Sequence, residues 1–214
     1  MKIAAISDTH EQLNKVTIPK DFDLLICAGD FTYRGAYFPV RNFLTQIKEI
    51  ANGRPIIIVP GNHELTLDKN NNEVTELMNI YCQNNIHYLV DKEVIIDGIK
   101  FWGSPYTPWF YDWAFNVPRD IIQKHWDLIP EDTKVLILHG PPHGILDKTR
   151  EGEHVGCEAL TNTINTKLKS LEVCIFGHIH ESYGHIKIGN TNYYNVSICN
   201  RNYEPIHPVT MIEI

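Results

Sequence analysis

Five short apolar runs recur along the chain, and each one ends at polar residues that can bind a metal ion or move a proton. The runs are rich in β-branched residues, as is typical of strands buried on both faces of a sheet. They are KIAAIS at 2–7, LLICA at 24–28, PIIIV at 55–59, VLIL at 135–138 and VCIF at 173–176. The groups that follow them are Asp8-Thr9-His10, Gly29-Asp30, Pro60-Gly61-Asn62-His63-Glu64, His139-Gly140 and Gly177-His178-Ile179-His180. Because loops at the carboxyl edge of an open α/β sheet converge, we expect one shared site there.

Other patterns predict hairpins and helices around these strands. Asp97-Gly98 and Gly189-Asn190 each separate two short β-rich runs, which predicts hairpins over 93–103 and 185–196. Apolar residues at 3–4 spacing predict three helices with core-facing stripes, namely Val40 to Ile50, Val74 to Tyr81 and Leu160 to Leu171. Strands that alternate with helices predict a mixed α/β domain, with sheets inside and helices outside. We expect residues 1–214 to form a single domain.

Composition narrows the functional classes. The chain of 214 residues is 43% hydrophobic, enough to build a sizeable core, and its formal net charge of −7 argues against a broad nucleic-acid surface. The five cysteines have no C-x-x-C spacing, so we expect free thiols in a reducing cytoplasm. No apolar run approaches the length of a membrane span, and we expect a soluble cytoplasmic protein.

The five polar groups indicate a functional site only when they are considered together. A strand-end Asp or His taken alone, such as Asp8, Asp30 or His139, is usually a turn former or a surface residue. The pair His178 and His180 fits packing as well as metal binding. Joint occurrence after five apolar strands favours a shared functional site.

The motifs SDTH, GDFTYRG, PGNHE, LHGPP and GHIH, in this order, resemble those of the calcineurin-like metallophosphoesterase superfamily. The segments GSPYTPWFYDWAF at 103–115, FGHIHESYG at 176–184 and NRNYEP at 200–205 look like its class III phosphodiesterase branch, the metallophosphoesterase-domain-containing (UPF0046-type) proteins. The resemblance implies an α/β fold with a four-layer αββα sandwich, in which helices flank two mixed central sheets.

The resemblance also implies a centre for two divalent metal ions. It makes Asp8, His10 and His180 ligands of one ion, and Asn62, His139 and His178 ligands of the second, with Asp30 between them. Mixed imidazole and carboxylate ligands favour Mn²⁺, Fe, Zn²⁺, Co²⁺ or Ni²⁺ over Mg²⁺. Of these ions we expect Mn²⁺.

Three further residues receive catalytic roles by resemblance. His63 is expected to protonate the leaving oxygen, and Glu64 is expected to orient His63. Arg34 matches an arginine that holds phosphate in Ser/Thr phosphatases, although a solvated surface charge explains it equally well. Pro60 stands where those phosphatases carry a second arginine, which disfavours that activity.

An aromatic stretch follows the strand predicted at 99–103. We interpret Phe101 and Trp102 as core residues. Aromatic faces can stack on nucleobases, so a substrate wall is an alternative to core packing for four others, namely Tyr106, Trp109, Trp113 and Phe115.

The leading hypothesis is a dinuclear metal-dependent phosphodiesterase that hydrolyses small diesters, such as cyclic nucleotides, by in-line attack of an activated water. The alternatives are a phosphomonoesterase or phosphoprotein phosphatase, and a weakly active scaffold that binds a phosphate ligand. We expect a small phosphoester as the partner, and neither a membrane nor a nucleic-acid polymer. The sequence leaves the oligomeric state open.

Overall fold

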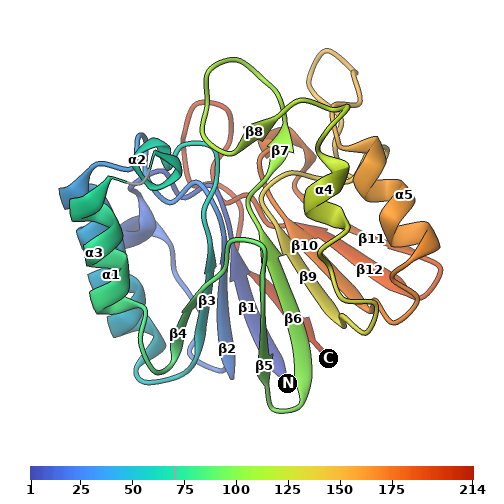
Figure 1. Ribbon diagram of the computed structural model, residues 1–214. Coiled ribbons are helices and arrows are strands. Elements are labelled where there is room, and N and C mark those ends of the chain that lie inside the picture. Colours follow the sequence, from blue (N-terminus) through green and yellow to red (C-terminus); the bar gives the residue numbers. More distant parts are fainter. Residues whose placement is uncertain (70) are drawn as a thin grey trace.

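Two β-sheets lie face to face in the middle of the molecule, and helices cover both outer faces (Figure 1). The computed structural model describes residues 1–69 and 71–214. The longer strands are β1 (Lys2–Ile6), β2 (Leu24–Ala28), β3 (Ile56–Val59), β4 (Ile86–Tyr88), β5 (Lys92–Ile96), β6 (Ile99–Ser104), β9 (Val135–Leu138), β10 (Val173–Phe176), β11 (Gly184–Ile188), β12 (Thr191–Asn195) and β13 (Thr210–Glu213). The short β7 (Thr107–Pro108) and β8 (Asn116–Val117) pair with each other. The α-helices are α1 (Tyr37–Ala51), α2 (Leu65–Asp68), α3 (Asn72–Tyr81), α4 (Gln123–Trp126) and α5 (Glu158–Thr166), and the 3₁₀ turns are η1 (Leu13–Lys15) and η2 (His180–Ser182).

The strand directions bring many loops to one edge. The first sheet has the order β13-β1-β2-β3-β4, and its strands are parallel except β13. The second has the order β11-β12-β10-β9-β6-β5, with antiparallel strands only at its two ends. A parallel bridge between Ser7 and Ser197 joins the two sheets just beyond β1 and β12. The parallel strands of both sheets therefore end on the same side of the molecule.

Alternation along the strands produces three apolar layers. In β2, Leu24 and Ile26 face the second sheet, whereas Leu25 and Cys27 face α1. In β9, Val135 and Ile137 face the first sheet, and Leu136 faces α4 and α5. All these strand residues are fully buried. This period-two separation confirms the prediction of central sheets covered by helices on both sides.

The helices follow the predicted stripes with one difference. In α3, the Asn71 side chain accepts a hydrogen bond from the backbone N–H of Val74 at 3.2 Å and caps the first turn. Helix α5 ends at Thr166, although the apolar stripe continues to Leu171. Leu168 and Leu171 are buried in the same layer, so the buried apolar stripe continues beyond the end of the helix. None of the described helices is both long and apolar enough to cross a bilayer.

Candidate metal centre

The loops that leave β1, β2, β3, β9 and β10 converge at one edge of the two sheets (Figure 1). The structure brings together all seven residues that the family resemblance implies as ligands, which are Asp8, His10, Asp30, Asn62, His139, His178 and His180. Most of them are buried: Asp8, His10 and His139 are 0% exposed, and Asp30 is 2% exposed.

One group lies between the ends of β1 and β10. The candidate donor atoms of Asp8, His10 and His180 all lie within 4.8 Å of one another. Nε2 of His180 is 3.2 Å from Oδ1 of Asp8 and 3.3 Å from Nε2 of His10. Two imidazole nitrogens and a carboxylate oxygen thus face a common point.

A second group lies between β2, β3 and β9. Nε2 of His139 is 2.8 Å from Oδ1 of Asn62, 3.3 Å from Oδ2 of Asp30 and 3.2 Å from Nδ1 of His178. His178 and His180 reach different groups because their backbone is not extended: His178 has a φ of 71°, and His180 begins η2.

The outward ring nitrogens support metal binding. Nδ1 of His139 is 3.0 Å from the carbonyl oxygen of Ala28, and Nδ1 of His180 is 2.9 Å from that of Asn200. Donation to these carbonyls leaves the Nε2 lone pairs pointing into the site, the arrangement usual for a metal-bound imidazole. Facing lone pairs repel one another unless a proton or cation lies between them. The donor set therefore fits a cation.

The charge states are also suited to metal ligands. Burial lowers the pKa of His10 to about 4 and that of His178 to about 3, so both rings are neutral at pH 7. Burial also disfavours the charged forms of His139 and His180, but the carboxylates of Asp30 and Asp8 outweigh it and raise both pKa values to about 9. A metal ion binds the deprotonated ring, so its entry would release these protons.

The backbone around the centre is tightly constrained. Asp8, His10, Asp30 and His178 all have positive φ, between 41° and 71°, which is rare for residues with a side chain. Such conformations cost free energy and collect at functional sites. A Cβ at Gly177 would overlap the Asp8 carboxylate and the Ser7 side chain, so only glycine fits against these two side chains.

His63 lies beside both groups, but its ring is held by a different partner from the one expected. Nδ1 of His63 is 2.9 Å from the carbonyl oxygen of Tyr33, and Nε2 is 3.9 Å from Oδ2 of Asp30. Among the hydrogen bonds of the described residues, none joins Glu64 to the His63 ring. The buried Glu64 carboxylate accepts hydrogen bonds from the backbone N–H groups of Asp30, Thr32 and Gly61, and so fastens the loops after β2 and β3 together.

A cavity of about 300 Å³ opens over the centre. It is lined by Asp30, Asn62, His63, Phe110, Trp113, His178, His180, Glu181, Arg201 and Tyr203. Arg34 is exposed and stands outside this lining, so the arginine predicted to hold phosphate is not the one in the cavity. Tyr203 lies against His10, with ring centroids 4.6 Å apart and the rings near perpendicular.

Only one of the four predicted wall aromatics lines the cavity. Trp113 stacks on His63 with ring centroids 4.3 Å apart. Tyr106 instead stacks on His125, Phe115 is buried in the layer under α1, and Trp109 is 64% exposed outside the lining. The loop reverses at Tyr111 and Phe115, which both have positive φ, and this reversal decides which rings face the site.

Phe110, Glu181, Arg201 and Tyr203 line the cavity but are absent from the predicted site. Arg201 and Tyr203 come from the segment after β12. The sequence predicts β12 only as the second strand of a hairpin. β12 does pair antiparallel with β11, but it also pairs parallel with β10. Its carboxyl end therefore lies at the same edge as the metal centre. The NRNYEP segment at 200–205 enters the prediction only through its family resemblance, although its polar residues directly after the buried Ile198 and Cys199 could have identified it as a loop at the site.

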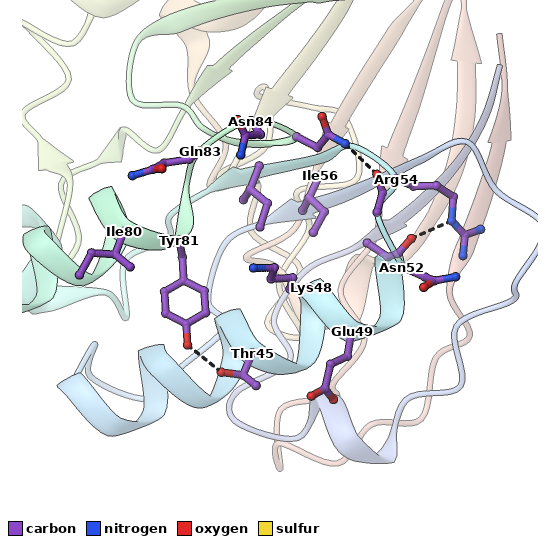
Figure 2. A pocket seen from close by; sticks show the side chains of 14 residues that line it. Thr45, Lys48, Glu49, Asn52, Arg54, Ile56, Ile80, Tyr81, Gln83 and Asn84 are labelled. Atoms are coloured by element: carbon purple, nitrogen blue, oxygen red, sulfur yellow. Dashed lines mark hydrogen bonds between the residues drawn. The ribbon is translucent and has the colours of Figure 1, made fainter.

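A larger cavity of about 730 Å³ lies near the amino ends of β3 and β4, away from the strand ends that carry the centre (Figure 2). Several of its polar side chains are already paired. The hydroxyls of Thr45 and Tyr81 are 3.1 Å apart, and the Asn85 side chain donates to the carbonyl oxygen of Gly53 at 2.7 Å. The groups suited to catalysis lie in the smaller cavity.

Comparisons with known proteins agree with this geometry. The model of the calcineurin-like phosphoesterase family matches residues 1–182. Human metallophosphoesterase domain-containing protein 1 is 37% identical over 233 residues, which cover 100% of this chain and 71% of that protein. UPF0046 protein K07C11.7 of Caenorhabditis elegans is 37% identical over 212 residues, with 94% of this chain and 71% of that protein covered.

A solved structure shares the fold. The protein TT1561 of Thermus thermophilus superposes with a TM-score of 0.65 at 13% identity, over 91% of this chain and 88% of that one. The two sheets and their covering helices are therefore an architecture already seen in a solved protein. With the family model matched over most of its length, the chain belongs to the calcineurin-like phosphoesterase family, alongside metallophosphoesterase domain-containing protein 1 and the UPF0046 proteins.

Proposed function

We propose that this protein is a dinuclear metal-dependent phosphodiesterase acting on small diesters such as cyclic nucleotides. The observation that carries the proposal is the pair of mixed donor groups at the base of one cavity, with the Asp30 carboxylate beside His139 of one group and near His10 of the other. Mn²⁺ is the ion we favour, and Fe, Zn²⁺, Co²⁺ and Ni²⁺ suit the same donors.

The residues of the chain have distinct roles in this proposal. Asp8, His10 and His180 would hold one ion, and Asn62, His139 and His178 the other, with Asp30 shared. The bound ions would supply positive charge on the phosphoryl oxygens and lower the pKa of a coordinated water. His63 would donate a proton from Nε2 to the leaving oxygen, since its Nδ1 is engaged by the Tyr33 carbonyl.

Two features favour diesters over monoesters. Pro60 occupies the position at which the resembling Ser/Thr phosphatases carry an arginine, so a clamp for the second charge of a monoester is missing there. Trp113 and Phe110 add aromatic surface to the cavity, which suits the organic group on the far side of a diester.

The test combines metal content with activity. The full chain is freed of metal, reconstituted with Mn²⁺ and assayed by elemental analysis, and we expect close to two ions per chain. Turnover of bis(p-nitrophenyl) phosphate should then exceed that of p-nitrophenyl phosphate in kcat/KM.

Each alternative function has its own signature in this assay. A monoesterase reverses the order of the two substrates, and a phosphate-binding scaffold binds the ions without turning over either ester. His178→Gly should lower both metal content and diesterase activity at limiting Mn²⁺, because it removes one imidazole from the second group. Unchanged metal content in this variant would remove His178 from the ligand set.

A further inference from the structure

Arg201 has an unusual position in the cavity over the metal centre. Among the described residues that line this cavity, it is the single lysine or arginine. The other ionisable groups of the lining are the carboxyls of Asp30 and Glu181, three imidazoles and the phenol of Tyr203. A phosphoester that enters the cavity therefore meets one permanent cationic side chain.

The loop that carries Arg201 is held in one conformation by its own hydrogen bonds. The Asn200 side-chain oxygen accepts from the backbone N–H groups of Asn202 at 2.9 Å and Glu204 at 3.0 Å. The Asn200 side-chain nitrogen donates to the Glu204 carboxylate at 2.7 Å, and an antiparallel bridge joins Cys199 to Pro205. Arg201 thus projects from a closed turn, which limits the directions its side chain can take.

The same turn is joined to the metal centre. The carbonyl oxygen of Asn200, one residue before Arg201, is 2.9 Å from Nδ1 of His180. Two residues after Arg201, the Tyr203 ring packs against His10 and, at a centroid distance of 6.2 Å, against His63. The backbone of Arg201 is therefore held next to the groups that would bind the ions and donate the proton, and its side chain lines the same cavity.

The guanidinium also has capacity for a ligand. Its ion-pair partner is Glu151, with Nη1 of Arg201 3.5 Å from the carboxylate oxygen, and the two side chains are 51% and 62% exposed. Pairs this exposed contribute little, because water and salt screen them. An anion in the cavity can compete with such a partner. The Glu181 carboxylate in the same lining repels anions, so binding of a phosphoester depends more strongly on the positive charge of Arg201.

We propose that Arg201 binds the phosphoryl group of the substrate and takes the place that Arg34 was expected to fill. The inference rests on the proposed function only in that the substrate is a phosphoester. The planar fork of a guanidinium can donate two parallel hydrogen bonds to two phosphoryl oxygens. Bound in this way, Arg201 would orient the substrate over the ions while Trp113 contacts its organic group.

The experiment measures binding and turnover on the full chain reconstituted with Mn²⁺. Inorganic phosphate is titrated by calorimetry, and kcat and KM are measured with bis(p-nitrophenyl) phosphate. Arg201→Gln should weaken phosphate binding and lower kcat/KM, each by roughly 10- to 100-fold, as expected for the loss of charge-assisted hydrogen bonds. Arg201→Lys should recover part of the loss, since it keeps the charge without the fork.

Control variants separate this role from general effects of charge. Arg41→Gln removes a positive charge from an exposed position on α1 and should change neither quantity. Glu151→Gln removes the exposed partner of Arg201 and should change phosphate affinity little, because the pair is weak. If Arg201→Gln proves unstable or loses metal, Arg201→Lys decides, and a phosphate affinity equal to that of wild type in that variant overturns the two-bond contact.

The outcomes distinguish this inference from the proposed function. Equal phosphate affinity in wild type and Arg201→Gln, at equal metal content, overturns the role of Arg201, and a loss in Arg34→Gln alone returns that role to Arg34. A wild-type protein that binds phosphate through Arg201 but does not hydrolyse the diester contradicts the phosphodiesterase and leaves the Arg201 site in place.

Discussion

His63 has two possible roles, as a metal ligand and as a proton donor. One ring nitrogen of His63 lies within 4.8 Å of a ring nitrogen of His10 and of a carboxylate oxygen of Asp30, so distance alone would admit it as a metal ligand. The Tyr33 carbonyl engages Nδ1 of His63, as backbone carbonyls engage Nδ1 of His139 and His180, so this contact fits either role. His63 differs in stacking on Trp113 in the cavity lining and in holding Nε2 at 3.9 Å from the Asp30 carboxylate, against 3.3 Å for His139. We propose on this basis that His63 transfers a proton.

We therefore expect His63→Gln to keep both ions and lower kcat by roughly 10²- to 10⁴-fold, the usual contribution of a general acid. The loss should be largest for a ribose alkoxide leaving group and smaller for p-nitrophenolate, which leaves without a proton. Metal content and kcat are measured together with both kinds of ester. His185→Gln, an exposed histidine on β11, is the matched control. Loss of an ion, or equal damage with both leaving groups, would make His63 a ligand or a structural residue.

At the scale of elements, the segment between β9 and α5 is fastened by one buried carboxylate. Asp147 accepts hydrogen bonds from the backbone N–H groups of Gly144 at 2.9 Å and Gly156 at 3.0 Å. Nδ1 of His154 is 2.6 Å from its other oxygen. Burial alone would raise the pKa of Asp147, but these donors outweigh it and hold the pKa below its usual range.

The sign of this shift predicts a pH dependence. A carboxyl whose pKa is lower in the folded state stabilises the fold fully above its unfolded pKa of about 3.9, and the contribution is lost as the pH falls through the folded pKa. Asp147→Asn should therefore lower the free energy of unfolding by about 1–3 kcal/mol at pH 7. The difference from wild type should shrink at pH 3. Urea unfolding at both pH values measures it, with the exposed Asp120→Asn as the control; a difference that does not change with pH would contradict the account.

On the scale of the whole molecule, the metal centre joins the two sheets. Asp8, Asp30 and Asn62 follow strands of the first sheet, whereas His139 and His178 follow strands of the second. Ions held by both sets would cross-link two halves that otherwise meet through the apolar layer between the sheets and the bridge at Ser7. Metal binding should consequently stabilise the entire fold.

We expect Mn²⁺ to raise the Tm of metal-free protein and a chelator to reverse the change. A ligand specific for the folded state stabilises it by about 2.7 kcal/mol at a free concentration of 100 times Kd. Differential scanning calorimetry at several Mn²⁺ concentrations measures this increase. His178→Gly should show a smaller gain, and His185→Gln the full one. A Tm independent of Mn²⁺ would show that the ions do not connect the sheets.

The sequence by itself determined the layers and the polar residues at the strand ends, because both depend on local pattern, and the family resemblance assigned those residues as ligands. Continuous apolar runs specify buried parallel strands, and parallel strands of one sheet end at a common edge, so Asp8, Asp30 and Asn62 gather at one edge and His139 and His178 at another. The packing of the two sheets then brings these edges together. Only the boundaries shifted, as at Thr166, where tertiary packing ends a helix inside a continuing apolar stripe.

The tertiary structure alone decided what surrounds those residues. Glu64 accepts hydrogen bonds from two loops. Phe115 packs in the core, whereas Trp113 lines the cavity. Arg201, and not Arg34, lies in the cavity lining. Loop side chains take their directions from positive-φ turns and from contacts between residues far apart in the chain, such as Asn200 with His180. No local periodicity records such contacts, and for this reason the substrate side of the site became visible only in the folded chain.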